Sequence, residues 1–186
     1  DFEKQINRWV FPWIQWWPFN HVMFAKAVAF EEILNDKHWR EAYTHQIIKN
    51  SKILAQSLTD LWRNLMTGWT DNHMFVVDVT KNHDKLTWIW WKKAEHVLEE
   101  IGLSTNKNMI PNDPRTPMDP SWIRIWTPAI TTRWLVEDDM KILAQVINTA
   151  LLNYEDDKSL ASCKEIIKTI CTNHPLPYGP REISMI

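Results

Sequence analysis

Apolar residues recur at the spacing of helical turns in five stretches of the chain. In the first, residues 20–34, the apolar face is so wide that the predicted helix is apolar nearly all round, which indicates burial on most sides. Asn20 stands where a capping residue is expected, shortly after Pro18. The other predicted helices have one apolar side, and they cover residues 38–61, 92–101, 137–151 and 160–170.

Two short runs have the composition of strands. Met74–Val79 is rich in β-branched residues and follows the turn signal Gly68–Asn72, whereas Ile123–Ile125 alternates apolar and charged residues. Gly102 is expected to end the helix before it. Residues 104–121 are polar and carry prolines spaced by three, so they are predicted to form an ordered loop that presents side chains.

The overall composition is that of a soluble globular protein. Of 186 residues, 45% are apolar, and 21 Lys+Arg nearly balance 23 Asp+Glu, so no charge pattern favours binding to nucleic acid. No run approaches the ~20 apolar residues that span a bilayer. Residues 1–4 resemble neither a signal peptide nor an initiator start, so we expect the chain to begin within a longer protein.

The two cysteines are expected to be free thiols. Cys163 and Cys171 lie on one predicted helix, about 12 Å apart along its axis at a rise of ~1.5 Å per residue. That separation is too large for a disulfide between them. Unpaired thiols indicate a reducing compartment, and we therefore expect a cytoplasmic protein.

Two residue counts are abnormal. Average usage of about 7% predicts roughly 13 glycines, yet the chain has 3 glycines and 13 tryptophans. The tryptophans lie in turns beside polar residues and proline, so they do not form the coplanar display of a sugar-binding or membrane-interface platform.

The histidines do not predict a metal site, because neither a His-Glu-x-x-His motif nor paired Cys-x-x-Cys motifs occur. His73 follows Asp71 and Asn72 before a predicted strand. We interpret it as part of a polar turn that satisfies its own backbone, with a catalytic histidine as the alternative.

Seven ordered segments carry a more specific pattern. They are Val10–Pro18 with Asn20–His21, Ala25–Ala29, Thr67–His73, Leu86–Trp88, Asn106–Asn108 with Ile110–Pro111, Ser121–Ala129, and Thr131–Trp134. Their order and spacing resemble the C-terminal portion of serine hydroxymethyltransferase, a pyridoxal-phosphate enzyme of the aspartate-aminotransferase fold type. The resemblance covers essentially the whole chain.

This resemblance implies an α/β fold of type I. Residues 1–36 would close the large cofactor-binding domain, and residues 37–186 would form the small C-terminal α+β domain. It also implies a homodimer or tetramer that acts on serine, glycine and tetrahydrofolate, with neither nucleic acid nor membrane as a partner.

The family transfers a one-carbon unit between serine and tetrahydrofolate with pyridoxal 5'-phosphate as cofactor, whose conjugated ring takes up electrons from the broken bond. The cofactor-binding lysine of the family lies in a Thr-x-x-His-Lys type motif that this chain lacks. We therefore expect the chain to be an inactive fragment of the enzyme. The alternatives are a threonine-aldolase-like enzyme that does not use folate, and a non-catalytic binding or regulatory chain.

The resemblance assigns roles to a few residues. Arg124 matches the arginine that holds the substrate carboxylate, although the sequence alone favours a strand arginine in a surface ion pair. Trp16 and Trp17 match two glycines whose N–H groups help to bind the cofactor phosphate of the partner subunit; a plain tight turn is the alternative. Asn108 matches a pteridine-binding asparagine. Thr116, Pro117 and Met118 match a Ser-Pro-Phe segment beside the folate, with a flexible thioether in place of the aromatic ring.

Tryptophan replaces family glycine systematically, at Trp13, Trp16, Trp17, Trp69, Trp88, Trp122, Trp126 and Trp134. Exchanging these eight would bring glycine from 3 to 11 and tryptophan from 13 to 5. We hypothesise that the gene uses UGA as a glycine codon and was translated by a table that reads UGA as tryptophan. If half of the sites need left-handed backbone, at roughly 1–2 kcal/mol each, the literal chain should fold poorly against a stability of about 5–15 kcal/mol.

Overall fold

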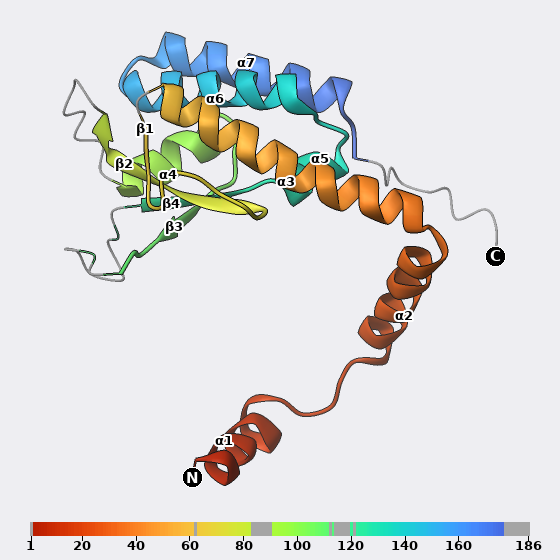
Figure 1. The fold of residues 1–186 in the computed structure, drawn as a ribbon. Coiled ribbons are helices and arrows are strands. Elements are labelled where there is room, and N and C mark those ends of the chain that lie inside the picture. The colour runs from red at the N-terminus through yellow and green to blue at the C-terminus, as the bar shows by residue number, and fades with distance from the viewer. Residues whose placement is uncertain are drawn as a thin grey trace. The chain divides into compact units, whose positions relative to one another are not determined.

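The computed structural model describes residues 2–61, 63–82, 91–111, 113, 120 and 122–176 (Figure 1). The chain divides into two compact units, Asp1–Ala42 and Tyr43–Ile186. The division falls inside one long helix, a few residues after the predicted boundary.

The first unit is helical. It contains α1 (Glu3–Arg8), an irregular turn η1 (Trp9–Ile14) and α2 (Asn20–Asn35). Phe11 interrupts η1 with extended backbone (φ −129°, ψ 127°), as expected for the residue before a proline.

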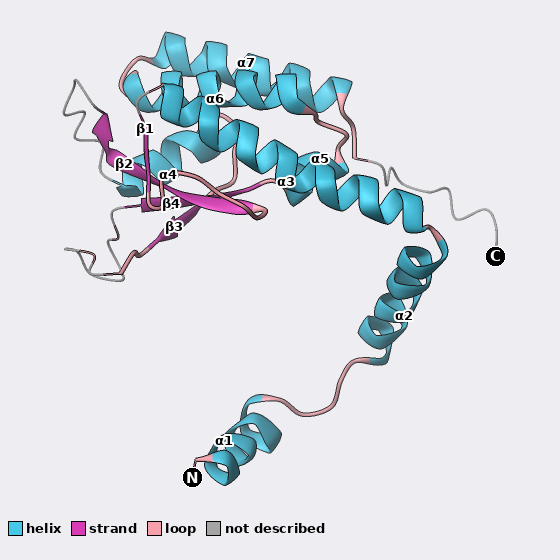
Figure 2. Cartoon of the chain, viewed as in Figure 1, coloured by secondary structure: helices cyan, strands magenta, loops and turns pink. Residues whose placement is uncertain are grey.

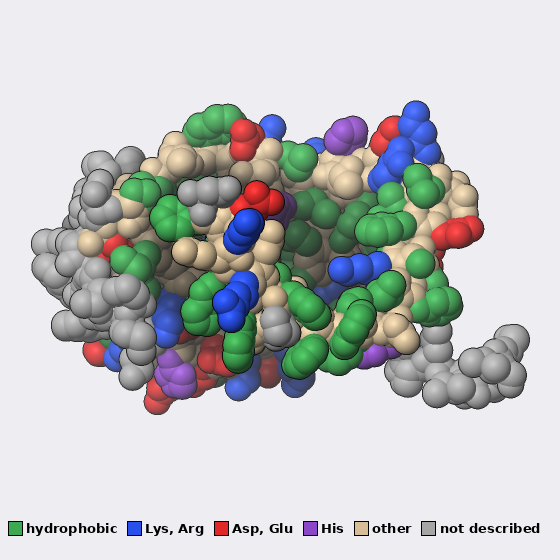
Figure 3. Space-filling view, turned by 90° about the horizontal axis from the view of Figure 1, so that it is seen from below, with side chains coloured by type: hydrophobic (Ala, Val, Ile, Leu, Met, Phe, Trp, Pro, Cys, Tyr) green, Lys and Arg blue, Asp and Glu red, His purple; other side chains and the backbone are tan. Residues whose placement is uncertain are grey.

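Two expectations for α2 are wrong. Asn20 is the first helical residue and not the cap; Phe19 takes that position, and its carbonyl accepts from the N–H groups of Val22 and Met23 (3.0 Å each). The helix also has no buried residue, since no described segment of its own unit covers its sides. Within α2, Phe24 and Phe30 are 72% and 61% exposed. The space-filling view in Figure 3 shows hydrophobic side chains, in green, on the molecular surface.

The second unit is an antiparallel sheet with a layer of helices (Figure 2). The strands are β1 (Arg63–Leu65), β2 (Met74–Asn82), β3 (Asn106–Asn108) and β4 (Trp122–Trp126), in the spatial order β1-β2-β4-β3. The helices are α3 (Lys37–Asp60), which begins in the first unit, α4 (Trp91–Glu100), α5 (Pro128–Thr132), α6 (Glu137–Leu152) and α7 (Asp157–Asn173).

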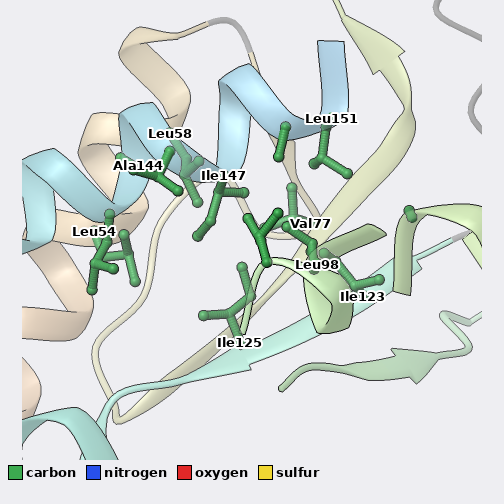
Figure 4. Packing of buried hydrophobic residues seen from close by; sticks show 14 of the residues in the cluster. Leu54, Leu58, Val77, Leu98, Ile123, Ile125, Ala144, Ile147 and Leu151 are labelled. Carbon is green, nitrogen blue, oxygen red and sulfur yellow. The ribbon is translucent and has the colours of Figure 1, made fainter. Parts of the chain in front are cut away.

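The core lies between the sheet and the helices (Figure 4). Strands β2 and β4 contribute Val77, Ile123 and Ile125. Helices α3, α4 and α6 face them with Leu54, Leu58, Leu98, Ala144, Ile147 and Leu151. Because this apolar surface is the main source of stabilisation, it fixes which side of each strand points towards the helices.

The periodicity located the four amphipathic helices, and the strands at Met74–Val79 and Ile123–Ile125 are confirmed within β2 and β4. The sequence analysis missed α1 and η1 in the first unit, and β1, α5 and β3 in the second. The last corrects part of the predicted loop 104–121, whose described beginning pairs with β4. Three-residue strands are too short to show a period, so the pairing partner decides them.

A buried polar network ties α3 to the segment after β4. Asn50 is fully buried on α3, and its Nδ2 donates to Thr131 Oγ1 (2.9 Å) and to the Leu135 carbonyl (2.8 Å). Its Oδ1 accepts from Gln46 Nε2 (2.8 Å). Tyr43, about two turns before Asn50 on α3, adds a further hydrogen bond of 2.6 Å between its hydroxyl and Thr132 Oγ1.

We predict that Asn50→Ala lowers the free energy of unfolding by about 1–3 kcal/mol, because it leaves buried partners without hydrogen bonds. Urea denaturation measures the change. The matched control is Gln56→Ala on the same helix, where an exposed side chain donates to Asp60 (2.8 Å); its effect should stay within about 0.5 kcal/mol. Equal effects of the two variants would contradict the structural role of Asn50.

The cysteines are free, as predicted, and they differ in exposure. Cys163 is buried on α7 and Cys171 is exposed on the same helix. Burial raises the pKa of the Cys163 thiol, which reduces its thiolate fraction and therefore its reactivity.

In the folded protein we expect Ellman's reagent to modify one thiol quickly and the second only after denaturation. Cys171→Ser should remove the fast phase, and Cys163→Ser should leave it unchanged. Two fast phases in the unmodified protein would show that Cys163 is accessible.

Candidate functional site

Strand β4 places Arg124 on the sheet face opposite the core. Side chains alternate along a strand, and the neighbours Ile123 and Ile125 are buried at 0% and 7% exposure. The antiparallel register sets Arg124 opposite Val76 of β2 and Asn106 of β3. Arg124 therefore occupies a central strand, on the face that does not carry the core.

The guanidinium of Arg124 has donors to spare. Its side chain is half-buried, and its Nε is buried without a hydrogen-bond partner among the described residues. The guanidinium carbon lies 4.9 Å from the centre of the Trp126 ring, a cation–π contact along the same strand. Within the described part of the chain, no ion pair to Arg124 is formed, so the expected surface ion pair is not the arrangement seen there.

The end of β4 is held by Thr127. This residue is fully buried, its N–H donates to the His73 carbonyl (3.0 Å), and its Oγ1 donates to the Ile47 carbonyl (2.9 Å). These bonds attach the strand to the start of β2 and to α3. Since Arg124 lies three residues before Thr127, the network also restrains the arginine's position.

The turn before β2 satisfies its own backbone. Thr70 Oγ1 donates to the Met74 carbonyl (2.7 Å), and Asn72 Oδ1 accepts from the Met74 N–H (2.9 Å). His73 contributes its carbonyl to Thr127. The interpretation of this stretch as a polar turn is confirmed.

Asn108 shares the open sheet face with Arg124. It is paired with Trp122, as Asn106 is paired with Arg124, so Asn108 and Arg124 are diagonal neighbours at a typical spacing of about 7–8 Å. The Asn108 amide donates to the carbonyl of Met109. Thr116, Pro117 and Met118 lie outside the described residues.

The loop at Trp16 and Trp17 does not fit a phosphate as these residues stand. Both indoles are exposed, and Phe11 packs edge-on against each of them, with ring centres at 6.0 and 6.3 Å. Residues Ile14–Asn20 line a shallow concavity that contains no basic side chain. Three aromatic rings are gathered at this loop, and its lining supplies no positive charge to a phosphate.

Arg63 is a second buried arginine, and sequence reasoning did not single it out. Its Nε donates to Asn148 Oδ1 of α6 (2.8 Å), and burial lowers its pKa to about 10, an effect that nearby Asp78 partly offsets. At 1% exposure the side chain has no access to a ligand. Strand β1 has three residues, which is too short for a periodic pattern, so no signal in the sequence could have identified Arg63 as buried.

The described residues contain no group of three or more histidine, cysteine or acidic side chains arranged to hold a metal ion. Over the same residues, no helix is both long and apolar enough to cross a membrane.

The described second unit is thus a mixed α/β unit with a half-buried arginine on its open sheet face, and a guanidinium can pair with a carboxylate or a phosphate. Residues 1–147 match the family model described as serine hydroxymethyltransferase. The chain belongs to the serine hydroxymethyltransferase family. This finding confirms the resemblance inferred from the seven sequence segments.

A curated relative gives the extent of the match. The serine hydroxymethyltransferase of Myxococcus xanthus (strain DK1622) is 43% identical over 180 residues, which cover 97% of this chain and 41% of that protein. The chain thus spans about two fifths of the length of its relative.

Proposed function

We propose that this chain is the C-terminal part of a serine hydroxymethyltransferase that interconverts serine and glycine and passes the one-carbon unit to tetrahydrofolate. The family match over residues 1–147 carries the proposal. The complete protein would use pyridoxal 5'-phosphate as cofactor and tetrahydrofolate as co-substrate. No observation favours the folate-independent aldolase or a non-catalytic chain.

Arg124 is the proposed binder of the substrate α-carboxylate. A planar guanidinium can make two parallel charge-assisted bonds to a carboxylate, which fixes orientation as well as position. The unpartnered Nε and the half-buried setting support this role, because the group is partly desolvated and its strand is anchored by Thr127. In the described structure the guanidinium contacts the Trp126 ring, and this contact would compete with a bound carboxylate.

Asn108 is proposed to contact the pteridine, together with the segment Thr116–Met118. Its place on the same sheet face as Arg124 supports the assignment, since substrate and folate must meet for a one-carbon unit to pass between them.

The finer architecture is also part of the proposal. Residues 1–36 would complete the large domain of a type I fold, and residues 37–186 would be the small domain. The apolar surface of α2 suits a helix that packs inside a larger domain. A homodimer in the cytoplasm completes this assignment, in keeping with two free thiols.

We predict that Arg124→Gln in the complete enzyme raises the KM for serine by about 10- to 100-fold. Charged hydrogen bonds contribute about 1.5–3 kcal/mol, and each 1.4 kcal/mol is a factor of ten. Arg124→Lys keeps the charge but not the two parallel bonds, so its KM for serine should lie between that of the unmodified enzyme and that of Arg124→Gln. Steady-state kinetics at saturating tetrahydrofolate measure both variants.

The control for loss of an arginine is Arg133→Gln. Arg133 Nη2 donates to the Cys171 carbonyl at the end of α7 (2.8 Å), so this variant should lower the melting temperature and leave the KM for serine unchanged. An unchanged KM in Arg124→Gln would refute the role of Arg124. Serine cleavage that proceeds equally well without tetrahydrofolate would instead point to the aldolase.

A further inference from the structure

The described backbone enters the left-handed region at three residues. They are Gly68 (φ 75°), Gly102 (φ 93°) and Trp134 (φ 65°). Glycine adopts this conformation freely because it has no Cβ, and a bulky residue there is a genuine outlier. Two of the three positions therefore have the expected residue, and the third has one of the largest.

Trp134 and Gly102 end their helices in the same way. After α4, the N–H of Gly102 donates to the Glu99 carbonyl (2.9 Å) and the N–H of Leu103 donates to the Leu98 carbonyl (2.8 Å). This is the Schellman arrangement, in which a left-handed residue follows the C-cap.

The turn after α5 repeats that pattern bond for bond. The N–H of Trp134 donates to the Thr131 carbonyl (2.9 Å), and the N–H of Leu135 donates to the Ile130 carbonyl (3.2 Å). A buried leucine, at 2% exposure, follows the left-handed residue here. The chain thus builds one motif twice, once with glycine and once with tryptophan.

Nothing in the setting of Trp134 compensates for its conformation. The side chain is 63% exposed, so it gains little from burial. The Asn50 network holds the flanking Thr131 and Leu135, so the backbone between them is fixed by interactions that do not involve the indole.

Other tryptophans in loops and turns share this exposure. Trp16, Trp17 and Trp69, which lie outside helices and strands, are 61–77% exposed, although tryptophan is highly buried on average in folded proteins. At Trp16 and Trp17 the indoles contact the Phe11 ring in the loop to which phosphate binding was assigned. Glycine at these positions would leave no exposed indole.

We infer that residue 134 is glycine in the protein made by the source organism, and that the exposed Trp16, Trp17 and Trp69 are glycine there too. The codon at these positions would be UGA, read as glycine. A single codon assignment then accounts for the left-handed tryptophan and these exposed indoles, and it moves the counts of 3 glycines and 13 tryptophans towards ordinary usage. The inference does not depend on the proposed enzyme activity.

The direct test reads the gene and the natural protein. We expect UGA at codon 134 and a tryptic peptide from the organism's own protein whose fragment masses place glycine at that position. UGG at codon 134, or tryptophan in the peptide, overturns the inference.

The physical test compares variants of the recombinant chain. Trp134→Gly should raise the melting temperature by about 2–8 °C, because it removes left-handed strain. Trp134→Ala should gain less, since alanine keeps the Cβ. If alanine does as well as glycine, the backbone argument is wrong.

Trp9→Gly is the matched control for the loss of an indole. Trp9 is 65% exposed, close to the 63% of Trp134, but its backbone is right-handed (φ −71°, ψ −40°). Glycine is unfavourable in helical backbone, so this variant should not raise the melting temperature. An increase equal to that of Trp134→Gly would attribute the gain to removal of any exposed indole and refute the assignment from backbone geometry.

Discussion

Strand β4 must hydrogen-bond to a strand on each edge and place its apolar side chains in the core at the same time. Most of the second unit is arranged around this constraint. It pairs with β2 on one edge and with β3 on the other, and it directs Ile123 and Ile125 towards the helices. A shift of one residue in either pairing would turn these isoleucines out and Arg124 into the core. Burial of a charged, unpaired guanidinium is costly, so the hydrophobic core and the arginine select the same register.

The polar network of α3 adds a second restraint at the end of this strand. Apolar packing tolerates small displacements, whereas Asn50 and Thr127 must satisfy specific donors and acceptors away from water. The network joins residues 80 to 85 positions apart in sequence and therefore fixes where β4 ends relative to α3. An arginine that is to orient a small substrate benefits from such a support, because the site's precision depends on the residues behind it.

The long amphipathic helices could be predicted because burial on one side leaves a repeating pattern over several turns. Strands β1 and β3 could not, since their existence depends on partners that are distant in sequence. The apolar periphery of α2 predicted burial on most sides, but the helix has no buried residue, because its pattern carries no information on what covers it. For the proposed site, the sequence motif singled out Arg124 as a candidate, while the unpartnered Nε and the contact with Trp126 are consequences of tertiary structure.

The tryptophan positions were expected to strain the backbone at about half of eight sites. Among the seven that the structure describes, only Trp134 has a positive φ, and Trp88 lies outside the described residues. The strain of about 1–2 kcal/mol at one site is too small to prevent folding by itself. At the other six described positions the backbone gives no reason of its own to require glycine.

The matching helix ends at Gly102 and Trp134 bear on how a codon is assigned to an amino acid. A helix end that repeats the hydrogen bonds of another helix end in the same chain supplies an internal reference for residue identity. It requires neither a relative nor an alignment, only stereochemistry. Backbone conformation is therefore evidence for codon meaning that is independent of sequence comparison, and a misread codon becomes visible where a side chain sits on backbone that glycine alone adopts freely.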